Sequence, residues 1–147
     1  MDNHRVATQY AKAAQDQEWE ELGVLMHDEF VARYPQSGET FRGRDAYVAM
    51  LANFPAGLGE ADFSSVKGGA DAIVTPPSQP FLSPTVTVFG GDHFVIEGVA
   101  TYADGAVWNF VSILRIQQRR VIEDTSYFAE PFDPPDWRKD YREPQPT

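Results

Sequence analysis

Two carboxylates in the second half of the chain have surroundings in which an acid or a base could work. Asp124 lies two residues before Ser126, so strand alternation places both side chains on one face. Glu97 lies within an apolar run, where burial would raise the pKa of a carboxyl group. Both also have simpler interpretations. Asp124 can pair with an arginine across a hairpin, either Arg115 or Arg120. Glu97 can be a solvated charge on the outer face of a sheet or at a dimer contact.

Hydroxyl groups supply a second kind of candidate, because they can donate hydrogen bonds to an oxyanion. Tyr34 precedes Pro35 at the end of a predicted strand, where it can border a pocket or pack as an ordinary aromatic residue. A phenol with a pKa of about 10 is a poor base at neutral pH, so Tyr34 is a candidate donor. Ser112 and Ser126 lie on predicted strands, and no histidine near Ser126 in sequence could make it a nucleophile.

Composition and spacing exclude several other kinds of site. The chain has 147 residues and no cysteine, which excludes disulfides and cysteine-ligated metals. The histidines His4, His27 and His93 lack metal-like spacing, and no glycine pair lies between a strand and a helix as a phosphate loop requires. With 12 basic and 22 acidic residues, the net charge of −10 disfavours nucleic acids and anionic membranes. We therefore expect no metal, no cofactor, no nucleic-acid partner and no membrane partner.

The hydrophobic pattern predicts the elements that position these residues. A helical stripe indicates helix within the first 26 residues, with Asn3 as its N-cap and a second short helix over 19–26. Runs of β-branched and aromatic residues, interrupted by Gly and Pro, predict the strands. The expected strands are 30–34, 39–42, 63–66, 81–89, 93–102, 106–116 and 121–128, with a third helix over 45–54.

Helices followed by a strand-rich half predict an α+β fold, in which three N-terminal helices pack on a strongly curved, mixed or antiparallel sheet. The length fits a single domain over residues 1–147. Residues 131–147 are expected to form an extended Pro-rich tail that Trp137 fastens to the body. We expect a conical cavity between the sheet and the helices, which is where the candidate side chains would meet.

Three segments, together with this order of elements, give the chain a family resemblance. They are Tyr34-Pro35-Gln36-Ser37-Gly38-Glu39 with Phe41-Arg42-Gly43-Arg44-Asp45, Glu97-Gly98 with Tyr102-Ala103-Asp104-Gly105 and Trp108, and Tyr127-Phe128-Ala129-Glu130-Pro131-Phe132 with Pro135-Asp136-Trp137-Arg138. The chain resembles the SnoaL-like branch of the nuclear transport factor 2-like superfamily over nearly its whole length. That resemblance implies the cone-shaped fold but not one reaction, because the superfamily includes isomerases, epoxide hydrolases, polyketide cyclases and proteins without catalysis.

Positions that match the catalytic groups of these enzymes hold other residues here. By the resemblance, Tyr34 falls where ketosteroid isomerases carry their general-base aspartate, and Ser112 lies near their oxyanion-hole aspartate. Ser126 falls where the limonene-epoxide-hydrolase pattern has an acid before a Tyr-Phe pair. Asp124 is the carboxylate that could substitute for these missing acids.

The resemblance and the residues together favour a domain that binds a small, apolar, cyclic molecule. The expected pocket residues are Tyr10, Tyr34, Phe54, Trp108, Phe110, Ser112, Asp124, Ser126 and Phe128. One alternative is an isomerase, cyclase or hydrolase acting on a polyketide-, terpene- or steroid-like substrate, with Asp124 or Glu97 as the acid–base group.

The other alternative is a homodimeric interaction module whose cavity is plugged by side chains. Relatives pair through the outer sheet face, where an apolar patch is expected from Val95, Val99, Val111 and Ile113. The absence of a recognisable signal peptide or spanning segment predicts a cytoplasmic protein.

Overall fold

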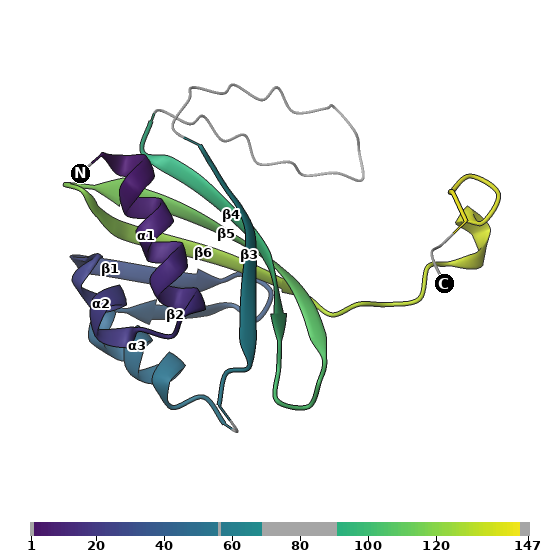
Figure 1. The fold of residues 1–147 in the computed structure, drawn as a ribbon, viewed down its shortest axis with the longest axis horizontal. Helices are drawn as coiled ribbons and strands as arrows, with labels where there is room; N and C mark the ends of the chain where they lie inside the picture. The colour runs from purple at the N-terminus through teal and green to yellow at the C-terminus, as the bar shows by residue number, and fades with distance from the viewer. Residues whose placement is uncertain (1, 56, 69–90, 145–147) are drawn as a thin grey trace.

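Three helices cover one face of a six-stranded sheet in the computed structural model, which describes residues 2–55, 57–68 and 91–144 (Figure 1). The helices are α1 (Asn3–Gln15), α2 (Trp19–Val24) and α3 (Arg44–Ala52). The strands are β1 (Met26–Tyr34), β2 (Glu39–Arg42), β3 (Glu60–Gly68), β4 (His93–Thr101), β5 (Val107–Gln117) and β6 (Arg120–Ala129), and a short 3-10 helix, η1, spans Asp136–Arg138. This is the α+β architecture that the sequence predicts.

The sheet is mixed, and its strand order is β2-β1-β6-β5-β4-β3. Neighbouring strands pair antiparallel except β1 and β6, which run parallel. Figure 1 shows β4, β5 and β6 as a long, twisted meander and α1 lying across the sheet. β6, the last of the described strands along the chain, therefore lies inside the sheet, between β1 and β5.

A single apolar core joins the helices to the inner face of the sheet. On α1, one stripe of small and aromatic residues is buried, as a helix with one face toward a core requires: Val6, Ala7, Tyr10, Ala11 and Ala13. On β4 and β5, buried and partly exposed residues alternate, so Ile96 and Leu114 face the helices while Val95 and Ile113 face outward.

The N-terminal helices differ from the prediction at both ends. Asp2, not Asn3, caps α1, because its Oδ1 accepts the backbone N–H of Arg5 at 2.8 Å. The second helix ends at Val24 instead of residue 26, and Met26 already belongs to β1, where it pairs with Val121 of β6. This long-range pairing extends β1 four residues upstream of the predicted strand.

The middle of the chain gave the weakest prediction. The expected strand 63–66 is the centre of the longer β3, and the expected strand 81–89 lies outside the described residues. Among the described residues, no helix is both long and apolar enough to cross a membrane.

The C-terminal segment contradicts the prediction for Trp137. Its side chain is 73% exposed, and Figure 1 shows the chain after β6 running away from the sheet and the helices. Trp137 therefore does not fasten the segment to the body of its own chain.

Gly59 is required by a close backbone approach at the entrance to β3. A Cβ atom there would overlap the carbonyl oxygen of Thr101 on β4, and backbone cannot move aside as a flexible side chain can. We expect Gly59→Ala to lower the free energy of unfolding by about 1–3 kcal/mol, as overpacking does. Gly23→Ala is the matched control. Gly23 lies within α2, and its added methyl would lie 4.0 Å from Val48 Cγ2. Because this contact is not crowded, Gly23→Ala should raise the free energy of unfolding in urea by about 0.4–1 kcal/mol.

Candidate functional site

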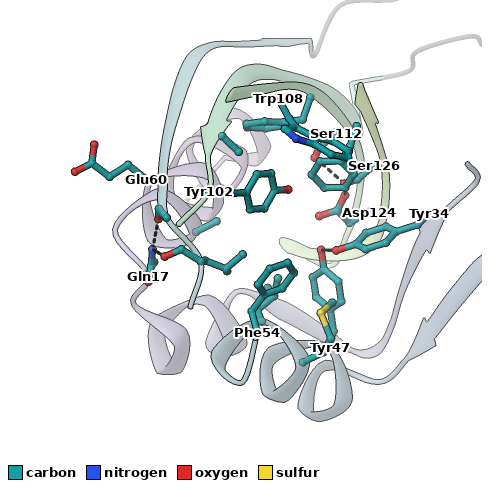
Figure 2. Close-up of a pocket in the computed structure, with 18 of the residues that line it drawn as sticks. Gln17, Tyr34, Tyr47, Phe54, Glu60, Tyr102, Trp108, Ser112, Asp124 and Ser126 are labelled. Carbon is teal, nitrogen blue, oxygen red and sulfur yellow. Dashed lines mark hydrogen bonds between the residues drawn. The ribbon is translucent and has the colours of Figure 1, made fainter. Parts of the chain in front are cut away.

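A cavity of about 630 Å³ lies between the helices and the inner face of the sheet. Its walls are largely aromatic and aliphatic, and Figure 2 shows side chains from α1, α3 and the strands converging on it. The structure places all nine residues of the expected pocket on its walls: Tyr10, Tyr34, Phe54, Trp108, Phe110, Ser112, Asp124, Ser126 and Phe128. Their role in binding a ligand stays a prediction.

Asp124 is a buried carboxylate in the wall of this cavity, only 4% exposed, whereas the other carboxylates that line it, Glu39, Glu60 and Asp104, are exposed. It lies in the centre of the sheet, between Ala32 of the parallel strand β1 and Leu114 of β5, both of which are fully buried. Strand pairing therefore fixes its backbone on both sides. A carboxylate held this way has little freedom to turn toward water.

Hydroxyl groups surround the Asp124 carboxylate. The Tyr10 hydroxyl donates to Oδ2 at 2.7 Å, and the Ser126 hydroxyl donates to Oδ1 at 2.7 Å. Ser126 Oγ in turn lies 2.7 Å from Ser112 Oγ, which extends the chain of hydrogen bonds onto β5 (Figure 2). This row of polar groups, the hydroxyl chain, is defined as Tyr10, Asp124, Ser126 and Ser112.

Burial raises the pKa of Asp124 above its ordinary value of 3.8, although the two donated hydrogen bonds work in the other direction. Among the described residues, the hydrogen-bond partners of Asp124 are hydroxyl groups, and none of its partners is a cation that would offset the burial. The expected pairing of Asp124 with Arg115 or Arg120 is wrong. Arg115 binds Glu123 on the other side of β6 at 3.1 Å, and Arg120 lies 3.5 Å from Asp28.

A pair of tyrosines forms the second polar group in the cavity wall. Tyr34 Oη at the end of β1 lies 3.0 Å from Tyr47 Oη on α3. Burial raises the pKa of both phenols, and the negative charge of Asp124 adds to this effect. Both hydroxyls are therefore protonated at neutral pH. One phenol donates to the other, which leaves one O–H proton of the pair available to a ligand oxygen.

An aromatic group borders the cavity on the side of β4 and β5. Tyr102 stacks with Phe54 at 5.9 Å between ring centres and meets Trp108 edge-on at 5.7 Å. Figure 2 shows the Tyr102 ring projecting into the middle of the cavity. On the far wall, Phe128 contacts Tyr34 edge-on at 5.3 Å. These rings offer flat apolar surfaces to a ring-shaped ligand.

Sequence reasoning missed Tyr47 and Tyr102 as site residues. The spacing of Tyr47 within its helix predicts an inward position. It does not show that the Tyr47 hydroxyl meets that of Tyr34, which lies on a strand. Tyr102 follows β4 directly at a turn in which Gly105 N donates to its carbonyl oxygen at 2.9 Å. An aromatic residue at a strand end beside an Asp-Gly turn was the available signal.

The other carboxylate candidate, Glu97, does not reach the cavity. It is exposed on the opposite face of β4, with Lys67 Nζ 3.6 Å from its Oε2. It therefore cannot act as the acid or base of this cavity. Within the part of the chain that the structure describes, no cluster of three or more His, Asp or Glu side chains could hold a metal ion.

Comparison with known proteins agrees with this architecture. The family model of the SnoaL-like domain matches residues 4–77. None of the curated proteins matches the sequence.

Solved structures share the fold at low sequence identity. An NTF-2 like protein of unknown function from Burkholderia xenovorans LB400 has a TM-score of 0.73 and 20% identity, with 98% of this chain and 95% of that chain covered. A Kribbella flavida protein described as a "putative ketosteroid isomerase" has a TM-score of 0.75 and 18% identity, covering 99% and 90%. An LEH-like epoxide hydrolase from M. tuberculosis has a TM-score of 0.59 and 11% identity, covering 86% and 81%.

These structural likenesses show the fold and not the reaction, because enzymes and a protein of unknown function share it. The family model, by contrast, matches half of the chain directly in sequence. The chain belongs to the SnoaL-like domain family, with the NTF2-like fold.

Proposed function

We propose that this protein binds a small, largely apolar cyclic molecule in the cavity between its helices and its sheet. The observation that carries this proposal is the cavity itself, about 630 Å³ in volume and walled by aromatic rings. Ligand sites of small-molecule binders typically measure about 300–1,000 Å³ and combine apolar walls with a few placed polar groups. The hydroxyl chain and the tyrosine pair are those polar groups.

The direction of the hydrogen bonds in the hydroxyl chain indicates which ligand group it prefers. While Asp124 is ionised, Ser126 uses its single proton to donate to the carboxylate, so Ser112 donates to Ser126. Ser112 Oγ then keeps lone pairs and has no proton left for the cavity. At this end the cavity therefore favours a ligand that donates, such as a hydroxyl or an enol.

The tyrosine pair has the opposite preference. Its remaining proton can be donated to a carbonyl or ether oxygen. A ligand that satisfies both ends carries an acceptor and a donor on one apolar ring system. A cyclic hydroxyketone is the simplest molecule of this class.

A thermal-shift series tests the proposal with a ring hydrocarbon, the matching ketone and the matching hydroxyketone. We expect the melting temperature to rise in that order. Binding at 100 times the dissociation constant stabilises by about 2.7 kcal/mol, and each kcal/mol corresponds to roughly 2–4 °C in a protein of this size. Ser112→Ala should remove the advantage of the hydroxyl. The double variant Tyr34→Phe/Tyr47→Phe should remove the advantage of the ketone, because either phenol alone keeps a proton to donate. If no compound of the series shifts the melting temperature, ligand binding of this class is ruled out.

A second candidate function, catalysis of proton transfer, is favoured by one observation. Asp124 is a buried carboxylate whose pKa is raised in the cavity, which is a property of general acids and bases. In this reading Asp124 takes a proton from a carbon next to a ketone, while the tyrosine pair donates to the ketone oxygen. The likeness to the Kribbella flavida and M. tuberculosis proteins supports an enzymatic role but does not select a reaction.

We also propose that residues 1–147 form one domain that pairs with a second copy through the outer sheet face. This outer face comprises the half-buried Val95, Val99, Val111 and Ile113 together with the exposed side chains of Val107 and Tyr127, 44% and 46% exposed. These six apolar side chains surround the exposed Glu97, which pairs with Val111 in the sheet, and their clustering on one face supports an interface. Light scattering at increasing protein concentration tests it, and a monomer at every concentration would refute it.

A further inference from the structure

The segment after β6 carries large apolar side chains with no cover from the body of the chain. This segment, the arm, comprises residues 130–144. Phe132 is 76% exposed, Trp137 is 73% exposed and Tyr141 is 87% exposed. In Figure 1 the arm extends away from the sheet and ends in a compact turn. Three exposed aromatic side chains within ten residues are a larger apolar surface than a short terminal segment needs for its own fold.

The end of the arm has a defined shape of its own. We call residues 135–142 the hook. Arg138 N donates to Pro135 O at 3.2 Å, Lys139 N to Asp136 O at 3.0 Å, and Tyr141 N to Arg138 O at 3.1 Å. These bonds build the 3-10 turn η1 at the tip of the arm.

A side-chain bond closes the hook. Arg142 Nη1 donates to Pro135 O at 3.0 Å, so both ends of the hook are fastened to one carbonyl group. The Arg138 guanidinium lies 5.6 Å from the centre of the Trp137 ring, and the paired prolines before η1 restrict the backbone. A segment that is already ordered loses less conformational entropy when it binds. The hook is therefore built to present Trp137 and Tyr141 outward.

The geometry of the arm limits what it can contact. Between the end of β6 and η1, residues 130–135 can span about 20 Å at roughly 3.3–3.6 Å per residue. The arm leaves from a strand whose outer side carries the exposed Tyr127, beside Val111 in the pairing of β5 and β6. The arm thus begins at the border of the outer face proposed as the dimer contact.

The area of the arm fits what a stable pair of chains requires. An aromatic side chain buries about 150–250 Å², so two arms of three aromatic residues would bury roughly 900–1,500 Å² on the arm side alone. Stable interfaces bury about 1,200–2,000 Å² in total. The arms therefore account for a major part of such an interface and are not an accessory to it.

We propose that the arm of each protomer packs its Phe132, Trp137 and Tyr141 side chains on a second copy of this chain, so that the two protomers exchange arms across a symmetric dimer. This inference goes beyond ligand binding and rests on the pairing of two copies through the outer face. The Trp137 contact that the sequence led us to expect within one chain forms between two chains instead.

The test compares two full-length variants by sedimentation equilibrium. Replacing Phe132, Trp137 and Tyr141 together with serine should raise the dimer dissociation constant at least about 30-fold, as the loss of interface hot-spot aromatics does. The control replaces the exposed, oppositely charged Lys139 and Asp140 with serine and leaves the net charge unchanged. It should change the constant less than about threefold. Because all five side chains are exposed, both variants should keep the fold of the wild type, which circular dichroism checks.

A second measurement follows Trp137 directly, as the difference in fluorescence between the wild type and Trp137→Phe. In the proposed dimer, this fluorescence is shielded from a soluble quencher, and dilution to the monomer removes the shielding. An unchanged dimer constant in the serine variant would overturn arm exchange and leave the outer-face dimer standing. Shielding that persists at dilutions where sedimentation shows a monomer would mean that the arm packs on its own body, which also overturns it. A wild type that stays monomeric at high micromolar concentration would overturn both, while ligand binding is scored separately by thermal shift.

Discussion

Asp124→Asn is expected to make the protein more stable at pH 8 than the wild type and to bring no such gain at pH 4. Burial raises the pKa of Asp124 above 3.8, so the folded chain holds this proton more tightly than the unfolded chain does. The stabilising contribution of the protonated form is complete below pH 3.8 and is lost as the pH rises through the raised pKa. Asparagine is uncharged throughout, so the difference in melting temperature between the variants should grow with pH.

Glu123→Gln on the same strand is the matched control, because the pKa of Glu123 is shifted in the opposite direction and its effect on stability should have the opposite sign. The Arg115 side chain lowers the pKa of Glu123, so the contribution of this carboxylate is present above its ordinary pKa and is lost as the pH falls through the lowered value. Glu123→Gln should therefore lower stability at pH 8, by a small amount because the pair is partly exposed. Parallel pH curves for the wild type and Asp124→Asn would show that Asp124 is not desolvated in the folded protein.

The same variant separates binding from catalysis. If Asp124 transfers protons, Asp124→Asn should slow deuterium exchange at the carbon next to the ketone of a bound ligand by about 10²–10⁴-fold. A pure binder would show no protein-dependent exchange in either form. Nuclear magnetic resonance in heavy water reads the exchange directly.

Ala14→Trp is expected to abolish ligand binding while the chain stays folded. Ala14 lines the cavity from α1 and is only partly buried, so an indole ring at this position occupies the space that a ligand needs. The stabilisation of about 2.7 kcal/mol that a ligand gives at 100 times its dissociation constant should fall close to zero. Isothermal titration with the tightest compound of the ketone series measures the loss.

Gln9→Trp is the control, since it places the same ring on the exposed side of the same helix. It should leave the dissociation constant within about twofold, as expected for a surface substitution away from the site. Unchanged binding in Ala14→Trp would mean that the ligand binds outside the cavity.

Elements bounded by turn residues were predictable from the sequence. The strand expected at 39–42 coincides with β2, because Gly38 and Gly43 flank it with positive φ angles of 76° and 90°. The third helix starts and ends close to its predicted bounds for a similar reason, since Gly43 precedes it and Pro55 follows it. Local sequence carries this information.

Long-range pairing was not predictable. Met26 continues a helical pattern locally, yet it joins β1 because Val121, far along the chain, supplies its partner. The exposure of Trp137 was not predictable for a similar reason. The sequence of the arm does not indicate whether its side chains pack against the sheet and helices of the same chain.

For the candidate site, the sequence predicted which side chains share a face of a strand better than it predicted their hydrogen-bond partners. Strand alternation grouped Ser126 and Asp124, the family resemblance pointed to Ser112, and the structure places these three on the cavity wall. The sequence did not reveal that Tyr10 would donate to Asp124, because 114 residues separate them. The sequence also did not show that Asp124 faces the cavity while Glu97 faces away from it. Alternate side chains of a strand lie on opposite faces of the sheet, and which face points inward depends on the helices that cover it.

The position of β6 in the sheet has a consequence for biosynthesis. β6 is synthesised after the other five described strands, yet it lies beside β1. A ribosome adds about 5–20 residues per second, so the roughly 85 residues between these strands take about 4–17 s to emerge. During that interval β1, with Phe30 on its apolar side, has no neighbour on this edge. The nascent chain therefore exposes an unpaired strand edge until translation reaches β6, and such an edge is a template for pairing with other chains.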